Sequence, residues 1–373
     1  MKVLHVSTND IKGGAALTAS SLVTALNKNT DITAELLVRD KFSKIDSIRQ
    51  VGNVDRGMAK FFSFVSQFYF KLSGIQYHSF PFGCTKLSYI VENGHYDLVH
   101  LHWVQAFFVD IADLQKIKSP IVWTLHDKWP LTLLSHLELS PDVPFFRDRI
   151  KQLTSVLKKM NAYKRLVLVS PSKHLADTAL EMGWQHVRVV RNQFTKHKHS
   201  QINFDSNVSL PKVVQDIGMI VAAGAKDTNK GLDDFIELAK YNPTKNFHVL
   251  GIDDLKLGPN IKTYTFTASR AFVFDFLKKL DYLFIPSKYE NFPSVAIEAF
   301  QVGTPVIGYR NNPGVSEIIS ESRFGKLIDA KDNLRCASIF AIEPSSDISL
   351  TILDDCYTSY LQHMKLYNEI LSD

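Results

Sequence analysis

Two glutamates separated by seven residues are the side chains best placed to do chemistry. Glu290 follows a β-rich run that ends at Pro286, and Glu298 lies in a helical pattern that we expect to begin near Ser294. This order places Glu298 about one turn into the helix, facing the same crevice as the loop of Glu290. The N–H groups at a helix start favour phosphate or sugar oxygens, and a carboxylate one turn further can accept both hydroxyls of a ribose. The alternative is a helix cap followed by a solvent-facing glutamate.

Two segments in the first half also place polar groups at strand ends. Gly13 and Gly14 follow the first apolar run and lead into a helix, which lets a ligand approach the backbone closely. His126 follows another apolar run and precedes Asp127, at the edge where open α/β sheets bind ligands. The alternatives are a tight turn without a ligand and a histidine that bonds only to neighbouring backbone.

His100 and His102 lie two residues apart and therefore share one face of a predicted strand. Such a pair suits a metal ion, but the sequence offers no evident third ligand. We therefore expect packed, hydrogen-bonded histidines near the acceptor and no metal site.

The elements that must position these residues alternate along the chain. Short apolar runs and amphipathic helical patterns follow one another in both halves, as in parallel sheets covered on both faces. The predicted strands are Val3–Ser7, Ala34–Val38, Leu98–Leu101, Ile121–Leu125, Leu166–Val169, Val187–Val190, Ile217–Ala222, Phe247–Leu250, Tyr282–Pro286 and Val306–Tyr309. The predicted helices between them include Ala16–Leu26, His174–Met182, Leu232–Ala239, Ala271–Leu280 and Val295–Gln301. The sequence therefore predicts an α/β protein of two domains, joined near the polar stretch 200–216.

Composition excludes several classes of protein. The 43 basic and 38 acidic residues of the 373-residue chain leave a net charge of +5, too small an excess for a nucleic-acid partner. Three scattered cysteines indicate a reducing, cytoplasmic compartment. Because the chain enters a strand pattern at once and has no apolar run of bilayer length, we expect neither a signal peptide nor a transmembrane helix.

The segment E-N-F-P-S-V-A-I-E, from Glu290 to Glu298, resembles the E-x7-E signature of retaining glycosyltransferases of family 4. Blocks within 224–231, 124–132 and 170–173 also resemble this family, and the H-D-x-W-P-x-T run from His126 is similar to its bacterial exopolysaccharide members. The resemblance extends from the first strand to about Asp329. It implies the GT-B fold, in which two Rossmann-like domains face each other across a cleft.

The resemblance also implies roles for individual residues. Lys230 and Lys226 would contact the donor diphosphate, Glu298 the ribose, and Glu290 and His126 the donor sugar. Of these, Glu290, His126 and Lys230 are the expected catalytic residues. The other expected donor contacts are Gly13, Gly14, Phe266, Asn291, Phe292, Pro293, Ser294 and Val295. No metal or other cofactor is expected, because lysine and helix N-termini can neutralise the diphosphate.

The activity implied is transfer of a sugar from a nucleotide-sugar, UDP-linked more readily than GDP-linked, to a saccharide acceptor with retention at the anomeric carbon. We expect a role in cell-surface polysaccharide biosynthesis, with an acceptor carried on a polyprenyl diphosphate. The alternatives are a nucleotide-sugar 2-epimerase and a non-catalytic nucleotide-sugar-binding protein. An NAD-linked dehydrogenase is disfavoured because the G-x-G-x-x-G fingerprint is missing.

Two segments depart from the family pattern. At the end of the first domain only Asn192 fits the usual motif, and residues 133–136 replace the usual glycine and cysteine after Thr132. The second departure lies where the acceptor site is expected, so the acceptor cannot be carried over from relatives.

The last helix of GT-B enzymes commonly crosses back to the first domain. We therefore predict a first domain of residues 1–192 plus 356–373 and a second domain of residues 193–355. The predicted docking face of the tail is Leu361, Met364, Tyr367 and Leu371, which are spaced three and four residues apart.

Residues 56–72 form a helical pattern dense in aromatic residues. One face carries Phe61, Phe64, Val65, Phe68 and Leu72, and Arg56, Lys60 and Lys71 flank it. This pattern predicts an interfacial helix that attaches the first domain to the inner face of an anionic membrane. The alternative is a helix that packs its aromatic residues into the core.

Overall fold

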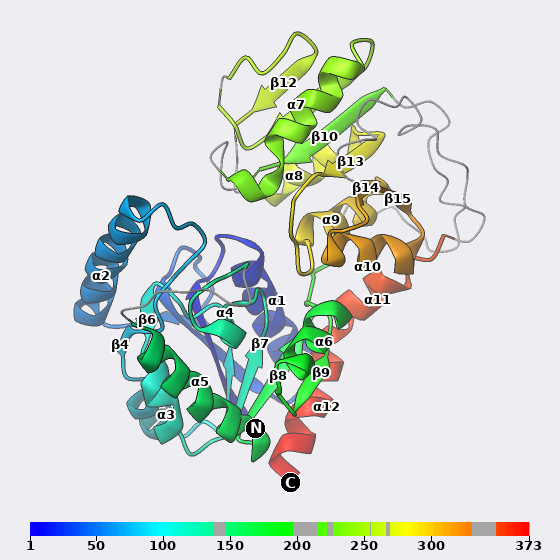
Figure 1. The fold of residues 1–373 in the computed structure, drawn as a ribbon. Helices are drawn as coiled ribbons and strands as arrows, with labels where there is room; N and C mark the ends of the chain where they lie inside the picture. Colours follow the sequence, from blue (N-terminus) through cyan, green and yellow to red (C-terminus); the bar gives the residue numbers. More distant parts are fainter. Residues whose placement is uncertain are drawn as a thin grey trace. The chain divides into compact units, whose positions relative to one another are not determined.

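The computed structural model describes residues 1–137, 146–196, 215–221, 227–253, 255–265, 269–329 and 348–372. They form two compact units (Figure 1). Unit 1 comprises Met1–Phe194 with Thr358–Asp373, and unit 2 comprises Thr195–Tyr357. The chain thus changes unit slightly later than at the predicted boundaries after residues 192 and 355.

The described strands of unit 1 build one parallel sheet in the order β3-β2-β1-β5-β7-β8-β9, with a separate short pair of β4 and β6. The strands are β1 Lys2–Asn9, β2 Thr33–Asp40, β3 Ile48–Gln50, β4 Gly83–Thr85, β5 Leu98–Leu101, β6 Phe107–Val109, β7 Ile121–Thr124, β8 Leu166–Ser170 and β9 Val187–Val189. The central strands β5, β7 and β8 are buried throughout, which explains why their sequences are mostly apolar, although β5 also buries His100.

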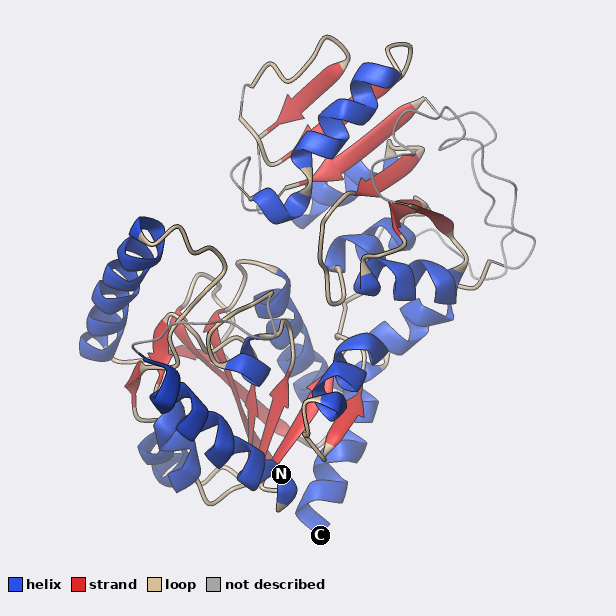
Figure 2. Ribbon diagram, in the orientation of Figure 1, coloured by secondary structure: helices blue, strands red, loops and turns tan. Residues whose placement is uncertain are grey.

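Helices cover both faces of this sheet (Figure 2). The helices of unit 1 are α1 Gly14–Asn29, α2 Asn53–Leu72, α3 Leu87–Gly94, η1 Ile111–Lys116, α4 Trp129–Thr132, α5 Arg147–Ala162, α6 Lys173–Glu181 and α12 Ser359–Ser372. Among them, α2 packs against the separate pair β4 and β6. Successive side chains of β1 pack in different hydrophobic clusters, because side chains alternate between the two faces of a sheet. Val3 packs in a cluster with α1 and α12, whereas Leu4 packs in a cluster with α3 and α5.

The C-terminal helix α12 completes the core of unit 1. Leu366 and Tyr367 are buried in the same cluster as β1 and α1, and Met364 packs against it. The predicted docking face is partly wrong, because Leu361 and Leu371 are 43% and 41% exposed. Buried polar residues of α12, Ser359 and His363, take part in the face instead.

Helix α2 turns its predicted aromatic face outward, so the alternative, in which this face packs into the core, is wrong. The exposed fractions are 63% for Phe61, 70% for Phe64, 57% for Phe68 and 73% for Leu72. The buried side is made of Ala59, Ser63, Ser66 and Phe70. Among the described helices, none combines the length and apolar character needed to cross a bilayer.

The described strands of unit 2 build a second parallel sheet in the order β12-β11-β10-β13-β14-β15. The strands are β10 Asp216–Ile220, β11 Asn246–Leu250, β12 Ile261–Tyr264, β13 Tyr282–Ile285, β14 Val306–Tyr309 and β15 Gly325–Ile328. The helices are η3 Thr228–Lys230, α7 Leu232–Tyr241, α8 Arg270–Lys278, α9 Ser294–Gln301, α10 Pro313–Ser322 and α11 Thr351–Tyr357. Lys230 follows β10 and Glu290 follows β13, and these two strands are neighbours at the centre of the sheet.

Candidate functional site

The turn after β1 presents an open backbone, as the glycine pair predicts. Gly13 has φ 90°, in the region that favours glycine, and a Cβ there would meet nothing within 4 Å. Gly14 begins α1, and both glycines are exposed. Asp10 anchors the turn by accepting hydrogen bonds from the N–H groups of Phe42 and Ser43. A ligand can therefore approach both the turn and the first N–H groups of α1.

Lys230 and Glu290 form an ion pair in unit 2. Nζ of Lys230 donates to Oε1 of Glu290 across 2.6 Å. Gly231 follows with φ 69°, and a Cβ there would lie 2.1 Å from the carbonyl oxygen of Pro286. Only glycine permits this close approach, which brings the turn before α7 against the end of β13.

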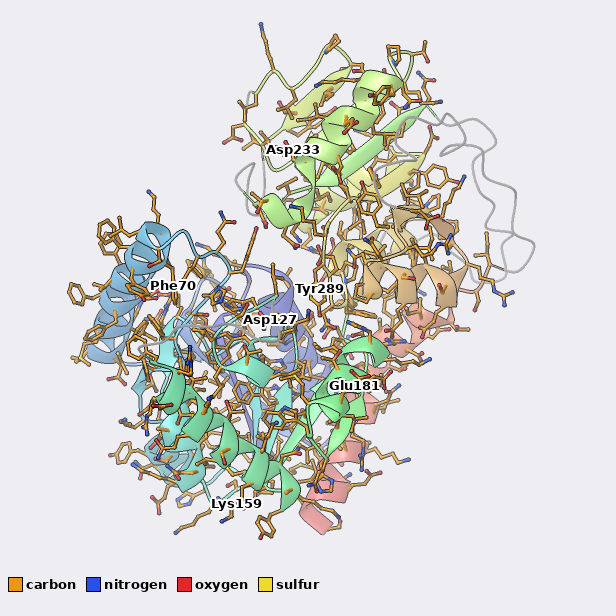
Figure 3. All side chains as sticks on the ribbon, in the orientation of Figure 1. Phe70, Asp127, Lys159, Glu181, Asp233 and Tyr289 are labelled. Atoms are coloured by element: carbon orange, nitrogen blue, oxygen red, sulfur yellow. The ribbon has the colours of Figure 1, made fainter. Side chains whose placement is uncertain are left out.

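Two buried asparagines hold the loop that carries Glu290. The side chain of Asn229 bonds to both the N–H and the carbonyl of Tyr289. Asn312 accepts from the N–H of Glu290 and donates to the carbonyl of Ser287, while it also caps α10. Tyr289 is labelled in Figure 3. Neither asparagine was predicted from the sequence, because the only signal for each is a polar residue beside a motif.

The loop then runs into α9. Asn291, Phe292 and Pro293 are buried, whereas Ser294 and Val295 are partly exposed in the first turn of the helix. The first N–H groups of a helix have no acceptor within it. Lys230, Glu290 and Val295 line one small hollow at the ends of β10 and β13.

Glu298 is only 5% exposed, so the solvent-facing alternative is wrong. Its Oε1 accepts from Nη2 of Arg270 on α8 at 2.6 Å, and no described residue donates to its Oε2. Burial raises the pKa of Glu298, and Arg270 opposes that rise. Arg270 belongs to none of the sequence motifs and was not predicted.

His126 lies just beyond β7 and is half-buried. Its Nε2 lies 3.2 Å from Nδ1 of His102. Burial lowers the pKa of His126 to about 4, although Asp127 acts in the opposite direction.

Asp127, labelled in Figure 3, organises the segment around it. It bonds to Nδ1 of His136 at 2.6 Å and to the backbone N–H of Trp129. Burial tends to raise the pKa of Asp127, but His136 and these hydrogen bonds lower it below its ordinary value. His136, within the segment that departs from the family pattern, therefore shapes the region beside His126.

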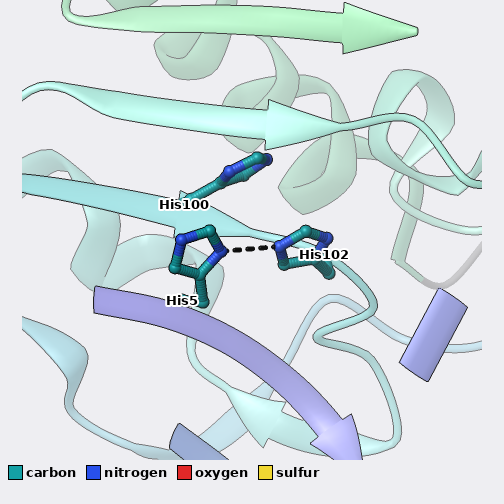
Figure 4. A group of neighbouring side chains, drawn as sticks. All are labelled: His5, His100 and His102. Carbon is teal, nitrogen blue, oxygen red and sulfur yellow. Dashed lines mark hydrogen bonds between the residues drawn. The ribbon is translucent and has the colours of Figure 1, made fainter. Parts of the chain in front are cut away.

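His100 and His102 are buried and hydrogen-bonded, and β1 adds a third imidazole, His5 (Figure 4). A third potential metal ligand therefore lies beside the pair, contrary to what we expected from the sequence. Both nitrogens of His100 already bond to protein, to the hydroxyls of Tyr367 and Thr124. Both nitrogens of His102 bond to other histidines.

Lys226 and Phe266 lie outside the described residues, and so does Gly224 of the diphosphate block. The structure thus brings together Lys230, Glu290 and the start of α9 in unit 2. In unit 1 it places Gly13 and His126 after the parallel strands β1 and β7.

Two family models match the chain in succession. The model described as Glycosyltransferase Family 4 matches residues 13–193, and the model described as Glycosyl transferases group 1 matches residues 213–338. A putative colanic acid biosynthesis glycosyl transferase of Escherichia coli (strain K12) is 22% identical over 69% of each chain. An uncharacterized protein encoded in the cps region of Klebsiella pneumoniae is 23% identical over 89% of this chain and 87% of its own.

Solved structures share the fold over the whole chain. Sucrose-phosphate synthase from Thermosynechococcus elongatus superposes with a TM-score of 0.63 and 14% identity, covering 100% of this chain and 99% of its own. HepE from Anabaena, crystallised with UDP and glucose, superposes with a TM-score of 0.59 and 16% identity, covering 100% and 97%. Each unit of this chain is a parallel α/β sheet flanked by helices, as a GT-B enzyme requires. The chain belongs to glycosyltransferase family 4 and has the GT-B fold.

Proposed function

We propose that this protein transfers a sugar from a nucleotide-sugar, preferably a UDP-sugar, to a saccharide acceptor in the biosynthesis of a cell-surface polysaccharide. The Lys230–Glu290 pair beside the first turn of α9 carries this proposal. The colanic acid relative and the cps-region relative support the polysaccharide role. HepE, crystallised with UDP-glucose, supports the choice of donor.

In this proposal Lys230 and the start of α9 hold the donor diphosphate. An ammonium and backbone N–H groups stabilise the negative charge that develops as the diphosphate leaves. Glu290 accepts from Lys230 and so fixes the direction of its ammonium group. The ammonium and the backbone N–H groups would contact the diphosphate where a divalent cation otherwise would, so we propose catalysis without a metal cofactor.

Glu298 is proposed to bind the ribose. Arg270 holds one carboxylate oxygen, and Oε2 remains available for the ribose hydroxyls. The cation also favours the ionised form of Glu298, which accepts hydrogen bonds more strongly than the neutral form.

The transfer breaks the bond between the anomeric carbon and the diphosphate oxygen and forms a bond to an acceptor hydroxyl oxygen. We propose retention, with attack on the face from which the diphosphate leaves. The departing phosphate oxygen takes the acceptor proton. His126 and the Gly13–Gly14 backbone are proposed to contact the donor sugar or diphosphate.

We further propose that α2 attaches the protein to the inner face of the cell membrane and that the acceptor is linked to a polyprenyl diphosphate. The exposed aromatic face of α2 suits the boundary between headgroups and acyl chains. Arg56 and Lys60 already pair with Asp40 at 2.9 Å, so Lys71 is the flanking cation best placed for anionic headgroups.

The test is to incubate the purified protein with UDP- and GDP-sugars, with and without a polyprenyl-diphosphate saccharide, in the presence of EDTA. We expect UDP release that depends on the acceptor. An epimerised donor formed without acceptor would favour the 2-epimerase. Thermal stabilisation by UDP-sugars without UDP release, under all acceptor conditions, would favour a binding protein.

A further inference from the structure

Three imidazoles of unit 1 form a chain of hydrogen bonds that ends at His126. Nδ1 of His5 lies 3.0 Å from Nε2 of His102, and Nδ1 of His102 lies 3.2 Å from Nε2 of His126 (Figure 4 shows the first contact). The ring centroids of these pairs are 5.3 and 5.5 Å apart, and the ring planes are inclined by 19° and 30°. The rings therefore meet edge to edge, so that the N–H of one nitrogen points at the lone pair of the next.

The three rings are neutral near pH 7. Burial, assisted by His363, lowers the pKa of His5 to about 3. Burial likewise lowers the pKa of His102 well below its ordinary value and that of His126 to about 4. A neutral imidazole has one N–H donor and one acceptor nitrogen, so the proton positions of the three rings are coupled.

Two arrangements satisfy both contacts. If His126 donates from Nε2, His102 must donate from Nε2 to His5, and the proton of His5 then lies on its own Nε2. That atom is buried and has no hydrogen-bond partner among the described residues. If His5 donates from Nδ1, its Nε2 is left as a bare lone pair, and His126 carries its proton on Nδ1.

A buried N–H without an acceptor is rarer in folded proteins than an acceptor without a donor. We infer that His5 and His102 are positioning residues, which hold His126 in the Nδ1–H tautomer. Nδ1 of half-buried His126 then acts as a hydrogen-bond donor toward an oxygen of the ligand and cannot accept a proton.

The inference that His126 donates a hydrogen bond to the ligand rests on the proposed function, whereas the tautomer of His126 does not.

His100 stacks on His102, with ring centroids 4.3 Å apart, but bonds to Thr124 and Tyr367 and is not part of the hydrogen-bonded chain of imidazoles. A metal ion held by His5, His100 and His102 would have to displace the hydrogen bonds of the latter two.

The experiment is a ¹⁵N–¹H correlation spectrum of the full-length, histidine-labelled protein without ligand, with the signals of His126 identified by their loss in His126→Asn. We expect His126 as the Nδ1–H tautomer in the native sequence. His102→Phe keeps a ring in place but removes the donor to His126, so we expect the Nε2–H form to appear and the KM for the donor to rise. His95→Asn, on an exposed turn, is the matched control and should change neither the tautomer of His126 nor the KM for the donor.

Finding His126 as the Nε2–H tautomer in the native sequence would overturn the inference, whatever the effect of His102→Phe on folding. An unchanged tautomer in a folded His102→Phe protein would also overturn it. So would stoichiometric binding of added zinc chloride that shifts the signals of His5, His100 and His102. If the native protein shows the Nδ1–H tautomer of His126 but transfers no sugar, the result would instead count against the proposed function.

Discussion

At the scale of single residues, Lys230 offers a direct test of how the diphosphate is held. Lys230→Ala is expected to lower kcat by about hundredfold or more, because the developing charge loses a preorganised cation. Circular dichroism should show an unchanged fold, since the side chain of Lys230 is 28% exposed.

Lys288→Ala is the matched control, an exposed lysine on the same loop as Glu290. It should retain the kcat of the native protein. Equal losses in the two variants would mean that loop charge in general, and not the Lys230 ammonium, supports turnover.

Arg270 is expected to set the pH range over which UDP binds. Burial raises the pKa of Glu298 and Arg270 opposes that rise, so Arg270→Gln should raise it further. Because the ionised carboxylate is the stronger acceptor, UDP affinity is lost as pH falls through this pKa, and the loss should begin at higher pH in the variant. Calorimetric titration with UDP between pH 5 and pH 8 measures this shift.

Arg310→Gln provides the control, because Arg310 pairs with Asp329 on the exposed surface of the same unit. Its UDP affinity should follow the native pH profile. If Arg270→Gln also follows that profile, Glu298 does not contact the nucleotide.

The residues proposed to contact ligands were easier to predict than the residues that hold their loops and side chains in place. Glu290, Glu298 and Lys230 belong to motifs a few residues long. By contrast, Asn229 reaches backbone groups 60 residues away, and Arg270 pairs with a residue on a neighbouring helix. No local spacing encodes such contacts, because only the packing of β13, α8 and α9 brings the partners together.

At the scale of elements, α2 makes a prediction about membranes. Phe64→Ser with Phe68→Ser should reduce co-sedimentation with vesicles of anionic phospholipid, because both rings are largely exposed and their removal takes apolar surface from the bilayer contact. Tyr89→Ser is the control, a 70% exposed aromatic residue on α3. Native protein that fails to sediment with vesicles at low salt would exclude the docking role of α2.

The apolar face of α2 was predictable from periodicity, but its direction was not. A helix that packs aromatic residues inward and one that presents them to lipid have the same spacing. Here Ala59, Ser63 and Ser66 allow the other side of α2 to pack closely. The edge strands β3 and β15 were missed for a related reason, since each is short and incompletely buried.

At the scale of the whole molecule, the buried histidines predict that unit 1 is sensitive to acid. Burial lowers the pKa values of His5, His100, His102 and His363 below the ordinary value of 6.5. The unfolded chain therefore takes up protons below about pH 6.5 that the folded unit does not. The free energy of unfolding therefore has its full value above that pH. Below it, this free energy should fall by about 1.4 kcal/mol per pH unit for each of these histidines.

Tryptophan fluorescence in urea, between pH 7.5 and pH 5, isolates this effect, because the four tryptophans of the chain, Trp103, Trp123, Trp129 and Trp184, all belong to unit 1. His363→Gln should reduce the slope of unfolding free energy against pH, and His95→Gln should not. Parallel slopes in all three proteins would show that the buried cluster does not control acid stability.

The packing of α12 in unit 1 has a consequence for the synthesis and folding of the protein itself. Tyr367 donates or accepts a hydrogen bond with His100, and Leu366 fills the same core, yet both residues are translated after the whole of unit 2. The ribosome adds roughly 5–20 residues per second, so the sheet of unit 1 emerges well before the helix that seals it. Until then the strands of unit 1 expose apolar surface that chaperones and proteases recognise. Loss of α12 would leave that surface open, so the core of unit 1 can be completed only after unit 2 has been synthesised.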